Sequence, residues 1–308
     1  FENYYQMNIP FRNNNNYYTY ASEQQKKLEG TFFLEHQGYW LNFLKTGVNP
    51  IQLARSVSTN EQTKKKHTSV LLQLNSAVNG RINKLAMKVG LTKFEMLKSI
   101  FDIFLSKVTG QDRFITATPL ANRPDPAYLN TIGLFSNLIP LESRVDAEST
   151  ILDFYASNKE KIRTSIKYGE YPFSEIAALR KQLHPNSLDR VDGIVFVYEE
   201  NMVDELHLTN PHTKQEFNLK ITETIQRAAK NPLTLFCREN NGALDSVWEY
   251  DPNLYDKAFI KKVSTYFRQF TENVIEQTNA TIADCSYLTK EDLEILQGFS
   301  QPSRKATN

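Results

Sequence analysis

Residues 117–142, ATPLANRPDPAYLNTIGLFSNLIPLE, contain two short apolar runs with a turn-forming segment between them. The runs are TATPLA (residues 116–121) and IGLFSNLIPL (residues 132–141), and each is typical of a buried strand. Turn formers and helix breakers separate the runs: Asn122, Pro124, Asp125 and Pro126. The stretch therefore predicts two strands joined by a loop, and the rest of the chain is organised around this unit.

Polar side chains are set into both apolar runs. Arg123 closes the first run, and Ser136 and Asn137 interrupt the second. A buried amide without partners costs about 1–3 kcal/mol, so Asn137 must either find hydrogen bonds or face a solvated cavity. Residue chemistry alone favours a core strand whose Asn satisfies a neighbouring loop. A polar cavity wall is the alternative.

Sequence motifs add a family resemblance to this pattern. The segments that carry it are Gly90–Thr92, Thr109–Asp112, Ala117–Arg123 and Ile132–Asn137. In order and spacing they resemble the second half of a condensation domain, the amide-forming unit of nonribosomal peptide synthetases that make antibiotics and other secondary metabolites. The family pattern is roughly Gly-x-Pro-x-Ala-x-Arg followed by Ile-Gly-x-Phe-x-Asn, and this chain departs from it only at Ala117. The resemblance implies a chloramphenicol-acetyltransferase-like fold.

Composition limits the classes of protein to which the chain can belong. With 308 residues and 40% hydrophobic residues, the chain can build one large domain or two modest ones. A net charge of +1 does not indicate the basic surface that binds nucleic acids. No apolar run approaches the length of a membrane span. Its two cysteines have no metal-ligand spacing and cannot form a disulfide framework. We therefore expect a cytoplasmic protein without a metal, a membrane or a nucleic-acid partner.

The boundaries of the chain suggest three regions. The sequence opens with Phe1 rather than Met, in mid-pattern, so we expect it to be a piece of a longer protein. By resemblance, residues 1–66 would connect two lobes and carry helices. Residues 67–287 would form the C-terminal lobe, and residues 288–308 would lead towards an adenylation domain.

Hydrophobic periodicity and capping signals predict the elements outside the central unit. Thr92 with Glu95 forms a capping box before an aromatic stripe that ends at Gly110, which predicts a buried helix. Asn240–Gly242 predicts a hairpin turn. Strands and helices alternate without a regular βαβ rhythm, which predicts an α/β sandwich with a mixed sheet. The predicted helices are 20–30, 33–45, 77–89, 92–110, 150–166 and 254–277, and the predicted strands are 67–75, 191–200, 215–226, 232–239 and 243–250.

Two further segments resemble family motifs, and the first of them is expected to be structural. Tyr171, Pro172 and Phe173 match the end of a His/Asn-Gln-Asp-Tyr-Pro-Phe signature, which would reverse the chain and dock Phe173. Gly133 and Phe135, in the Ile-Gly-x-Phe-x-Asn segment, are also expected to have a structural role. Near the start, Tyr17, Tyr20 and Ala21 fit Tyr-x-Asp-Tyr-Ala-x-Trp, but Thr19 replaces the acid and Glu23 replaces the tryptophan.

The chemistry of the family is acyl transfer, in which an amine attacks a thioester carbonyl. Such a reaction needs a basic group, donors for the oxyanion and a channel that holds both substrates. The family histidine lies in a His-His-x-x-x-Asp-Gly motif on the first lobe. None of the five histidines here is adjacent to another or precedes Asp-Gly at that spacing. We therefore assign no catalytic residue to this chain, expect the motif upstream of Phe1, and expect the chain to be inactive alone.

By resemblance, three residues would line the substrate tunnel: Asn137, Ser136 and Arg123. Asn137 is a candidate for positioning a carbonyl or amide. Arg123 is better suited to ordering a loop through hydrogen bonds, because internal arginines are more often structural than catalytic. Ser136 stands where the family usually has valine and would make the tunnel wall slightly more polar.

Three hypotheses about function follow from the resemblance. In the first, the chain is a condensation-domain lobe that binds no cofactor itself and acts on substrates carried on the phosphopantetheine of partner proteins. Its partners would be the N-terminal lobe, the upstream and downstream carrier proteins and the adenylation domain. In the second, it is a non-catalytic docking or scaffold module of the same fold. In the third, it is an epimerising or cyclising relative, although Ile132–Asn137 favours ordinary condensation.

Overall fold

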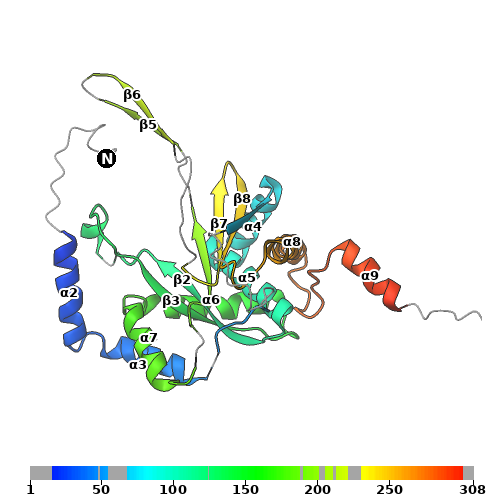
Figure 1. Cartoon of the computed structure of the whole chain (residues 1–308), viewed down its shortest axis with the longest axis horizontal. Coiled ribbons are helices and arrows are strands. Elements are labelled where there is room, and N and C mark those ends of the chain that lie inside the picture. Colours follow the sequence, from blue (N-terminus) through cyan, green and yellow to red (C-terminus); the bar gives the residue numbers. More distant parts are fainter. Residues whose placement is uncertain are drawn as a thin grey trace, which may run out of the picture.

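The computed structural model describes residues 16–47, 49–54, 68–123, 125–187, 190–200, 205–210, 213–220 and 230–300. Pro124 and much of the expected connecting segment before residue 68 lie outside the described residues. The described part is an α/β structure, as the sequence predicts (Figure 1). The three-region division of the chain stays a prediction.

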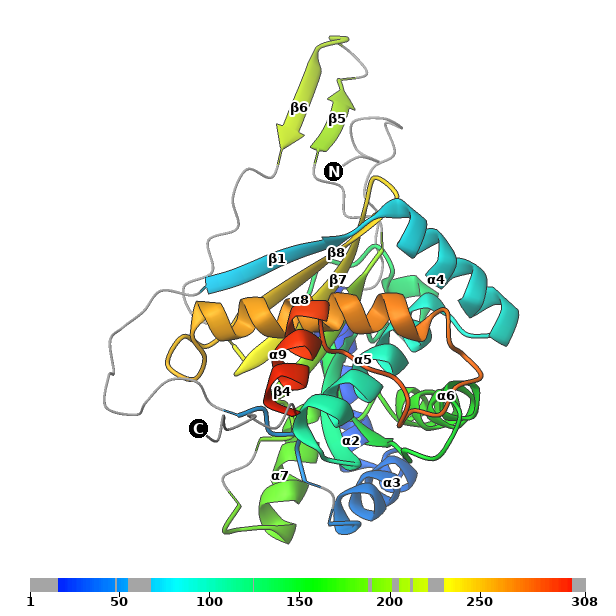
Figure 2. The ribbon, with the colours of Figure 1, turned by 90° about the vertical axis from the view of Figure 1, so that its right-hand side faces the viewer.

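Six of the described strands form one mixed sheet, in the order β1-β8-β7-β4-β2-β3, and Figure 2 shows β1, β8 and β7 side by side. β4 pairs in parallel with β2 and β7, and the other neighbours are antiparallel. β7 and β8 are joined by Asn241 and Gly242 with φ of 48° and 79°. These values confirm the predicted hairpin, since Asn-Gly tolerates positive φ. The strands are β1 (Thr68–Leu74), β2 (Arg113–Leu120), β3 (Asn137–Arg144), β4 (Ile194–Glu199), β7 (Leu233–Asn240) and β8 (Ala243–Tyr250).

Helices α4 (Ser76–Val89), α5 (Lys93–Thr109) and α8 (Lys257–Val274) cover one face of the sheet (Figure 2). The predicted capping box is confirmed, because Thr92 accepts from the Glu95 amide and the Glu95 carboxylate accepts from the Thr92 amide. Gly110 ends α5 in the left-handed conformation. The aromatic stripe of α5 is core, as predicted: Phe101 and Phe104 are fully buried.

The opposite face of the sheet is covered unevenly. Helices α3 (Leu34–Lys45) and α7 (Phe173–Leu183) pack over β2 and β3. Helix α6 (Ile151–Lys167) packs against β3 and against α5, on the face that α5 covers. Over β1, β7 and β8, none of the described helices covers the opposite face. There Leu71 is 63% exposed, and Phe236 and Val247 are only partly buried. A second sheet, the hairpin of β5 (Glu205–Thr209) and β6 (Glu216–Lys220), stands away from the six strands (Figures 1 and 2).

The remaining elements begin and end the described chain. Helix α2 (Tyr17–Glu29) begins three residues earlier than predicted, because the Asn16 side chain caps it. Helix α9 (Lys290–Ser300) is capped by Thr289, whose hydroxyl accepts from the Asp292 amide. Among the described residues, no helix is both long and apolar enough to cross a membrane.

The prediction for the second central strand was wrong in its extent. Only its second half is strand: β3 starts at Asn137, and Ile132 and Leu134 are 87% and 74% exposed. The apolar run reads as one strand in sequence, but its first half has no strand partner, since the β2 pairing ends at Leu120 opposite Asn137. Asn137 therefore opens a strand instead of interrupting one. Strand β5 was missed altogether.

Candidate functional site

The residues predicted to line a tunnel gather at one edge of the sheet. The parallel strands β2, β4 and β7 all end there. Arg123 follows β2 directly, and Asn137 pairs with Leu120 at the start of β3. Ligands of open α/β sheets bind outside the carboxyl ends of parallel strands, so this edge is the candidate site on geometric grounds.

Arg123 orders the loop between β2 and β3, as preferred from the sequence. Its guanidinium donates to the carbonyl oxygens of Tyr128 and Thr131, the latter at 2.9 Å. The guanidinium carbon also lies 4.1 Å from the centre of the Phe135 ring, which is a cation–π contact. Both carbonyls belong to the loop around the short 3₁₀ helix η1 (Pro126–Tyr128). Arg123 thus stabilises the conformation of this loop through two hydrogen bonds and one cation–π contact.

Asn137 joins β3 to the turn before α7. Its Nδ2 donates to the carbonyls of Gly169 and Tyr171, both at 2.8 Å. Its Oδ1 accepts from the amide of Phe173 at 3.0 Å. Both amide protons are therefore committed to backbone carbonyls, and only one further acceptor position is left on Oδ1. The tunnel-lining role of Asn137 stays a prediction, and in this arrangement its N–H groups hold the turn before α7.

The turn that Asn137 holds contains the predicted Tyr-Pro-Phe motif. Tyr171 is 3% exposed and packs edge-on against Phe33, with ring centres 5.5 Å apart. Pro172 is the N-cap of α7, and Phe173 opens the helix, partly buried. Burial raises the pKa of Tyr171, so its phenol stays protonated near neutral pH.

Two glycines at this edge are required by close approach. A Cβ on Gly169 would lie 2.3 Å from Leu120 Cδ1, and one on Gly133 would lie 2.3 Å from Tyr17 Cδ2. Gly133 was expected to be structural, whereas Gly169 was not singled out. Its shortest contact comes from Leu120, in a strand much earlier in the chain, which no local pattern shows.

An aromatic cluster fastens α2 to the loop. Tyr20, Tyr128 and Phe135 are buried together, and the Tyr20 and Phe135 ring centres lie 4.5 Å apart. Tyr20 was noticed only as part of a weak motif match, and Tyr128 was missed, because one tyrosine in a polar loop carries no periodic signal. Ser136 is exposed beside this cluster.

Lys93, at the start of α5, lies near the same edge, beside the end of β7. Its ammonium pairs with the Glu239 carboxylate and donates to Asn79 Oδ1 at 2.5 Å. Burial lowers the pKa of Lys93 to about 8. No pattern in the sequence indicated this cluster. Since both acceptors hold the ammonium, we assign Lys93 no role in proton transfer.

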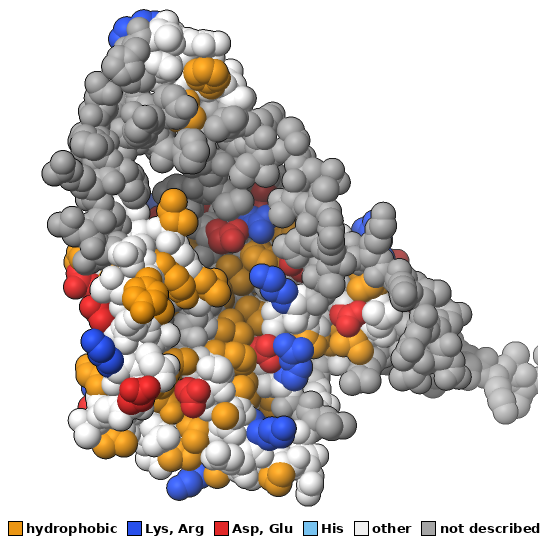
Figure 3. Space-filling model, turned by 60° about the vertical axis from the view of Figure 1, so that its left-hand side comes forward, with side chains coloured by type: hydrophobic (Ala, Val, Ile, Leu, Met, Phe, Trp, Pro, Cys, Tyr) orange, Lys and Arg blue, Asp and Glu red, His pale blue; other side chains and the backbone are white. Residues whose placement is uncertain are grey.

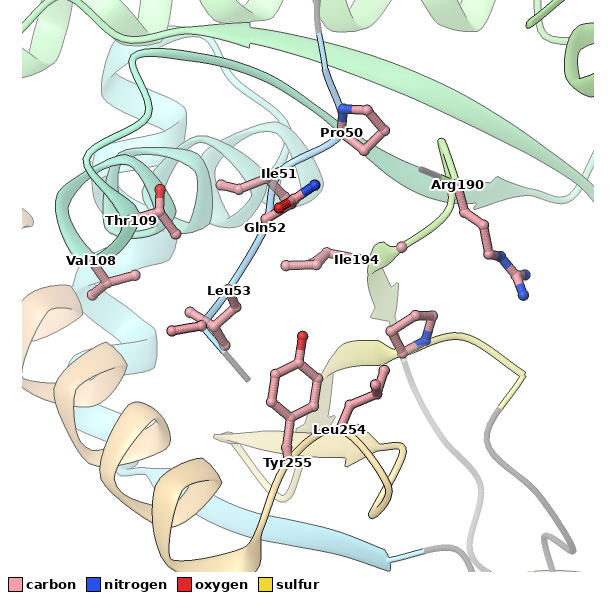
Figure 4. Close-up of a pocket in the computed structure, with 13 residues that line it drawn as sticks. Pro50, Ile51, Gln52, Leu53, Val108, Thr109, Arg190, Ile194, Leu254 and Tyr255 are labelled. Atoms are coloured by element: carbon pink, nitrogen blue, oxygen red, sulfur yellow. The ribbon is translucent and has the colours of Figure 1, made fainter. Parts of the chain in front are cut away.

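A second cavity lies at the opposite edge of the sheet. It measures about 620 Å³, and Figure 4 shows Tyr255 directing its hydroxyl between Leu53 and Ile194. None of the predicted tunnel residues lines it, and its described lining contains no carboxylate, histidine or cysteine. Arg190 on its rim already pairs with Asp192 at 2.6 Å. Cavity size alone therefore does not mark the candidate site.

The side of the molecule on which α2 lies is shown in Figure 3. Hydrophobic side chains gather in a hollow there, with acidic and basic side chains beside it. No group of three or more His, Cys, Asp or Glu side chains among the described residues could hold a metal ion.

The family model for the condensation domain matches residues 1–296 of the sequence. The chain belongs to the condensation-domain family. This assignment agrees with the motif resemblance and with the mixed α/β fold.

Curated relatives are much longer than this chain. One plipastatin synthase protein of Bacillus subtilis (strain 168) is 22% identical over 90% of this chain but only 8% of its own length. Tyrocidine synthase 3 of Brevibacillus parabrevis is 22% identical over 91% of this chain and 4% of its own length. The chain thus spans less than a tenth of each of these two relatives.

Solved structures share the fold at low sequence identity. A four-domain nonribosomal peptide synthetase bound to AMP and glycine matches with a TM-score of 0.74, at 20% identity, over 89% of this chain and 21% of that one. The first condensation domain of the calcium-dependent antibiotic synthetase, in complex with a substrate analogue, has a TM-score of 0.67 and 14% identity, over 87% and 56%. The X-domain of teicoplanin biosynthesis, solved in complex with OxyB, has a TM-score of 0.77 and 18% identity, over 92% and 62%.

Proposed function

We propose that the chain is the C-terminal lobe of a condensation domain that joins aminoacyl or peptidyl groups carried as thioesters on carrier proteins. The family assignment of residues 1–296 carries this proposal. The chain would supply one wall of the substrate tunnel, lined by Asn137, Ser136 and Arg123. Substrates would arrive on the phosphopantetheine of upstream and downstream carrier proteins within a synthetase that also contains an adenylation domain.

The reaction sets the demands on this wall. The amine of one substrate attacks the thioester carbonyl of the other, the carbon–sulfur bond breaks, and the amine proton leaves with a base or the departing thiolate. Correct positioning of the two tethered substrates supplies much of the rate in such a reaction. Residues of this chain would contribute by shape: Arg123 holds the loop and Asn137 holds the turn, so the wall is fixed before substrates enter.

A second lobe would complete the domain. The chain covers 56% of a solved condensation domain, so that protein contains a large further part. The face of β1, β7 and β8 that none of the described helices covers, with Leu71 63% exposed, offers apolar surface of the kind that marks protein contacts. We propose that the N-terminal lobe, with its histidine motif, packs near this face and the adjoining carboxyl edge.

Reconstitution tests the proposal. A longer protein that includes the upstream segment should form the dipeptide from loaded carriers, followed by mass spectrometry, whereas the 308-residue chain alone should not. Asn137→Ala in the longer protein should slow the reaction by about tenfold, because its loss frees the turn. An unchanged rate would remove Asn137 from the site.

The alternative function is a docking module without catalysis. It is favoured by one observation, the fold shared with an X-domain that was solved as a complex with another protein, OxyB. In that case the intact parent would lack adjacent histidines upstream of Phe1. The parent's sequence therefore separates the two functions at once.

A further inference from the structure

Helix α2 is tied by side chains to both segments that flank Asn137. On the loop side, Asn122 Nδ2 donates to the Tyr20 hydroxyl at 3.2 Å, and the Tyr128 hydroxyl donates to Glu23 Oε2 at 2.7 Å. On the turn side, the Lys27 ammonium pairs with the Glu170 carboxylate. One helix therefore holds the loop after β2 and the turn before α7 at the same time.

These contacts close into a ring. Arg123 holds the Tyr128 carbonyl and stacks on Phe135. Phe135 lies two residues before Asn137, which in turn holds the carbonyls on both sides of Glu170. The path runs from α2 through the loop, through Asn137 and the turn, and back to α2. A displacement of the loop from α2 therefore changes the position of Asn137.

A cavity of about 240 Å³ lies within this ring, lined by polar and charged side chains of α2, the loop and the turn. Among the described residues, the buried apolar packing between α2 and the loop consists of one small aromatic cluster, beside which Tyr17 contacts Phe135. Polar contacts therefore carry a large share of the attachment, and a single hydrogen bond has more effect here than in a packed core.

We propose that Glu23 and Tyr128 form a positioning pair whose hydrogen bond fixes the loop against α2 and thereby sets where Arg123 and Asn137 hold the tunnel wall. The catalytic part of this inference rests on the proposed function. Tyr128 is 3% exposed, and its hydroxyl is aimed at the Glu23 carboxylate. Glu23 stands where the family pattern has tryptophan, so the acceptor is a feature of this chain.

The bond persists across the neutral pH range. The hydrogen bond to Glu23, with smaller effects of burial and neighbouring acids, raises the pKa of Tyr128 to about 12. The phenol thus stays protonated and donates to the Glu23 carboxylate. Glu23→Gln keeps an acceptor oxygen and is the conservative variant.

Hydrogen exchange on the chain itself tests the structural half of the proposal. Tyr128→Phe and Glu23→Ala should each speed amide exchange of the loop and of the Tyr171–Phe173 turn by about fivefold, the loss of one hydrogen bond. The double variant should exchange no faster than either single variant, because both remove the same bond. Glu23→Gln should stay near the parent.

A variant on the same helix serves as control. Gln25 is exposed and donates to Glu29 within α2, so Gln25→Ala should leave the exchange of loop and turn unchanged. Unchanged exchange in both single variants would overturn the positioning pair. Additive effects in the double variant would overturn it as well.

Kinetics in the longer protein test the catalytic half. Tyr128→Phe should lower kcat about fivefold while the KM for the loaded carriers stays within about twofold, as expected for lost positioning. Glu23→Gln should recover most of the rate. A fall in carrier affinity at constant kcat would contradict a positioning role. If the unsubstituted longer protein forms no amide, the proposed function fails while the exchange result still decides the positioning pair.

Discussion

The core around α5 and the edge that carries the candidate site are stabilised in different ways. Around α5, one cluster of buried side chains joins α4, α8 and five strands, and Phe101 contacts Phe196, Trp248 and Phe267. At the edge, the buried cluster contains only three aromatic residues. The loop and the turn there are held mainly by hydrogen bonds from Arg123 and Asn137 to backbone carbonyls. Hydrophobic area stabilises the first region, whereas directional hydrogen bonds shape the second.

The difference predicts how each region responds to substitution. Loss of apolar volume in the core lowers the free energy of unfolding of the whole protein. Loss of a polar contact at the edge changes local geometry and costs less global stability, because the affected segments lie at the surface. Core substitutions should therefore mainly lower the free energy of unfolding, whereas edge substitutions should mainly affect function.

The largest effect is expected for Phe101→Ala. Phe101 is fully buried, and a truncated core phenylalanine lowers the free energy of unfolding by about 3–5 kcal/mol. Tyr18, which is 78% exposed, offers the matched control, and Tyr18→Ala should cost less than about 0.5 kcal/mol. Urea denaturation of both variants makes the measurement. A similar loss for both would refute the contrast.

Gly169→Ala should come next. Its Cβ would lie 2.3 Å from Leu120 Cδ1 and 2.9 Å from the Ile166 carbonyl, and overpacking of this kind costs about 1–3 kcal/mol. On α3, a Cβ at Gly38 meets nothing within 4 Å, so Gly38→Ala should be neutral or stabilising by up to about 1 kcal/mol. Thermal unfolding should show a lower Tm for Gly169→Ala and an equal or higher Tm for Gly38→Ala. Equal Tm shifts in the two variants would mean that close approach does not constrain Gly169.

Asn137→Ala should have a smaller effect on stability. Three backbone groups lose their partner, but the turn can reach water, so we expect about 1–2 kcal/mol. Asn137→Asp keeps the acceptor for the Phe173 amide and loses both donors. In Asn137→Asp the Phe173 amide should therefore stay protected from hydrogen exchange. The rest of the turn should exchange as fast as in Asn137→Ala, because the contacts to the Gly169 and Tyr171 carbonyls are lost in both variants. Equal exchange of the Phe173 amide in both variants would contradict this assignment of contacts.

The smallest effect is expected at the surface. Arg81 and Glu276 form an ion pair at 2.7 Å, with side chains 49% and 54% exposed. Exposed pairs contribute about 0–1 kcal/mol, so Arg81→Ala should shift stability by less than that and should not alter exchange at the edge. A loss above about 1 kcal/mol at about 0.15 M salt would show a coupling that the two-region description lacks.

The sequence predicted the core well because its signals are local. The Thr92 capping box, the aromatic stripe of α5 and the Asn241–Gly242 turn each lie within one element or hairpin, and each is confirmed. Periodicity also identified α8 and the strands β7 and β8.

The edge was predicted only in part, because its contacts are long-range. Motif resemblance identified Arg123 and Asn137, but no pattern could show that Asn137 reaches a turn more than thirty residues away. The apolar run 132–141 was predicted as one strand, since the missing partner for its first half depends on where β2 ends. Glu23 and Tyr128 are far apart in the chain, and no residue pattern links them.

Crosslinking in the longer protein tests most directly whether the carboxyl edge is the tunnel wall. Both native cysteines are buried, so a cysteine placed at the exposed Ser136, or at Glu148 near the opposite end of β3, can be labelled selectively. A carrier protein loaded with a thiol-reactive acyl group should capture Ser136→Cys and leave Glu148→Cys unmodified. Equal capture at both positions, or capture at Glu148→Cys alone, would contradict the placement of the tunnel at this edge.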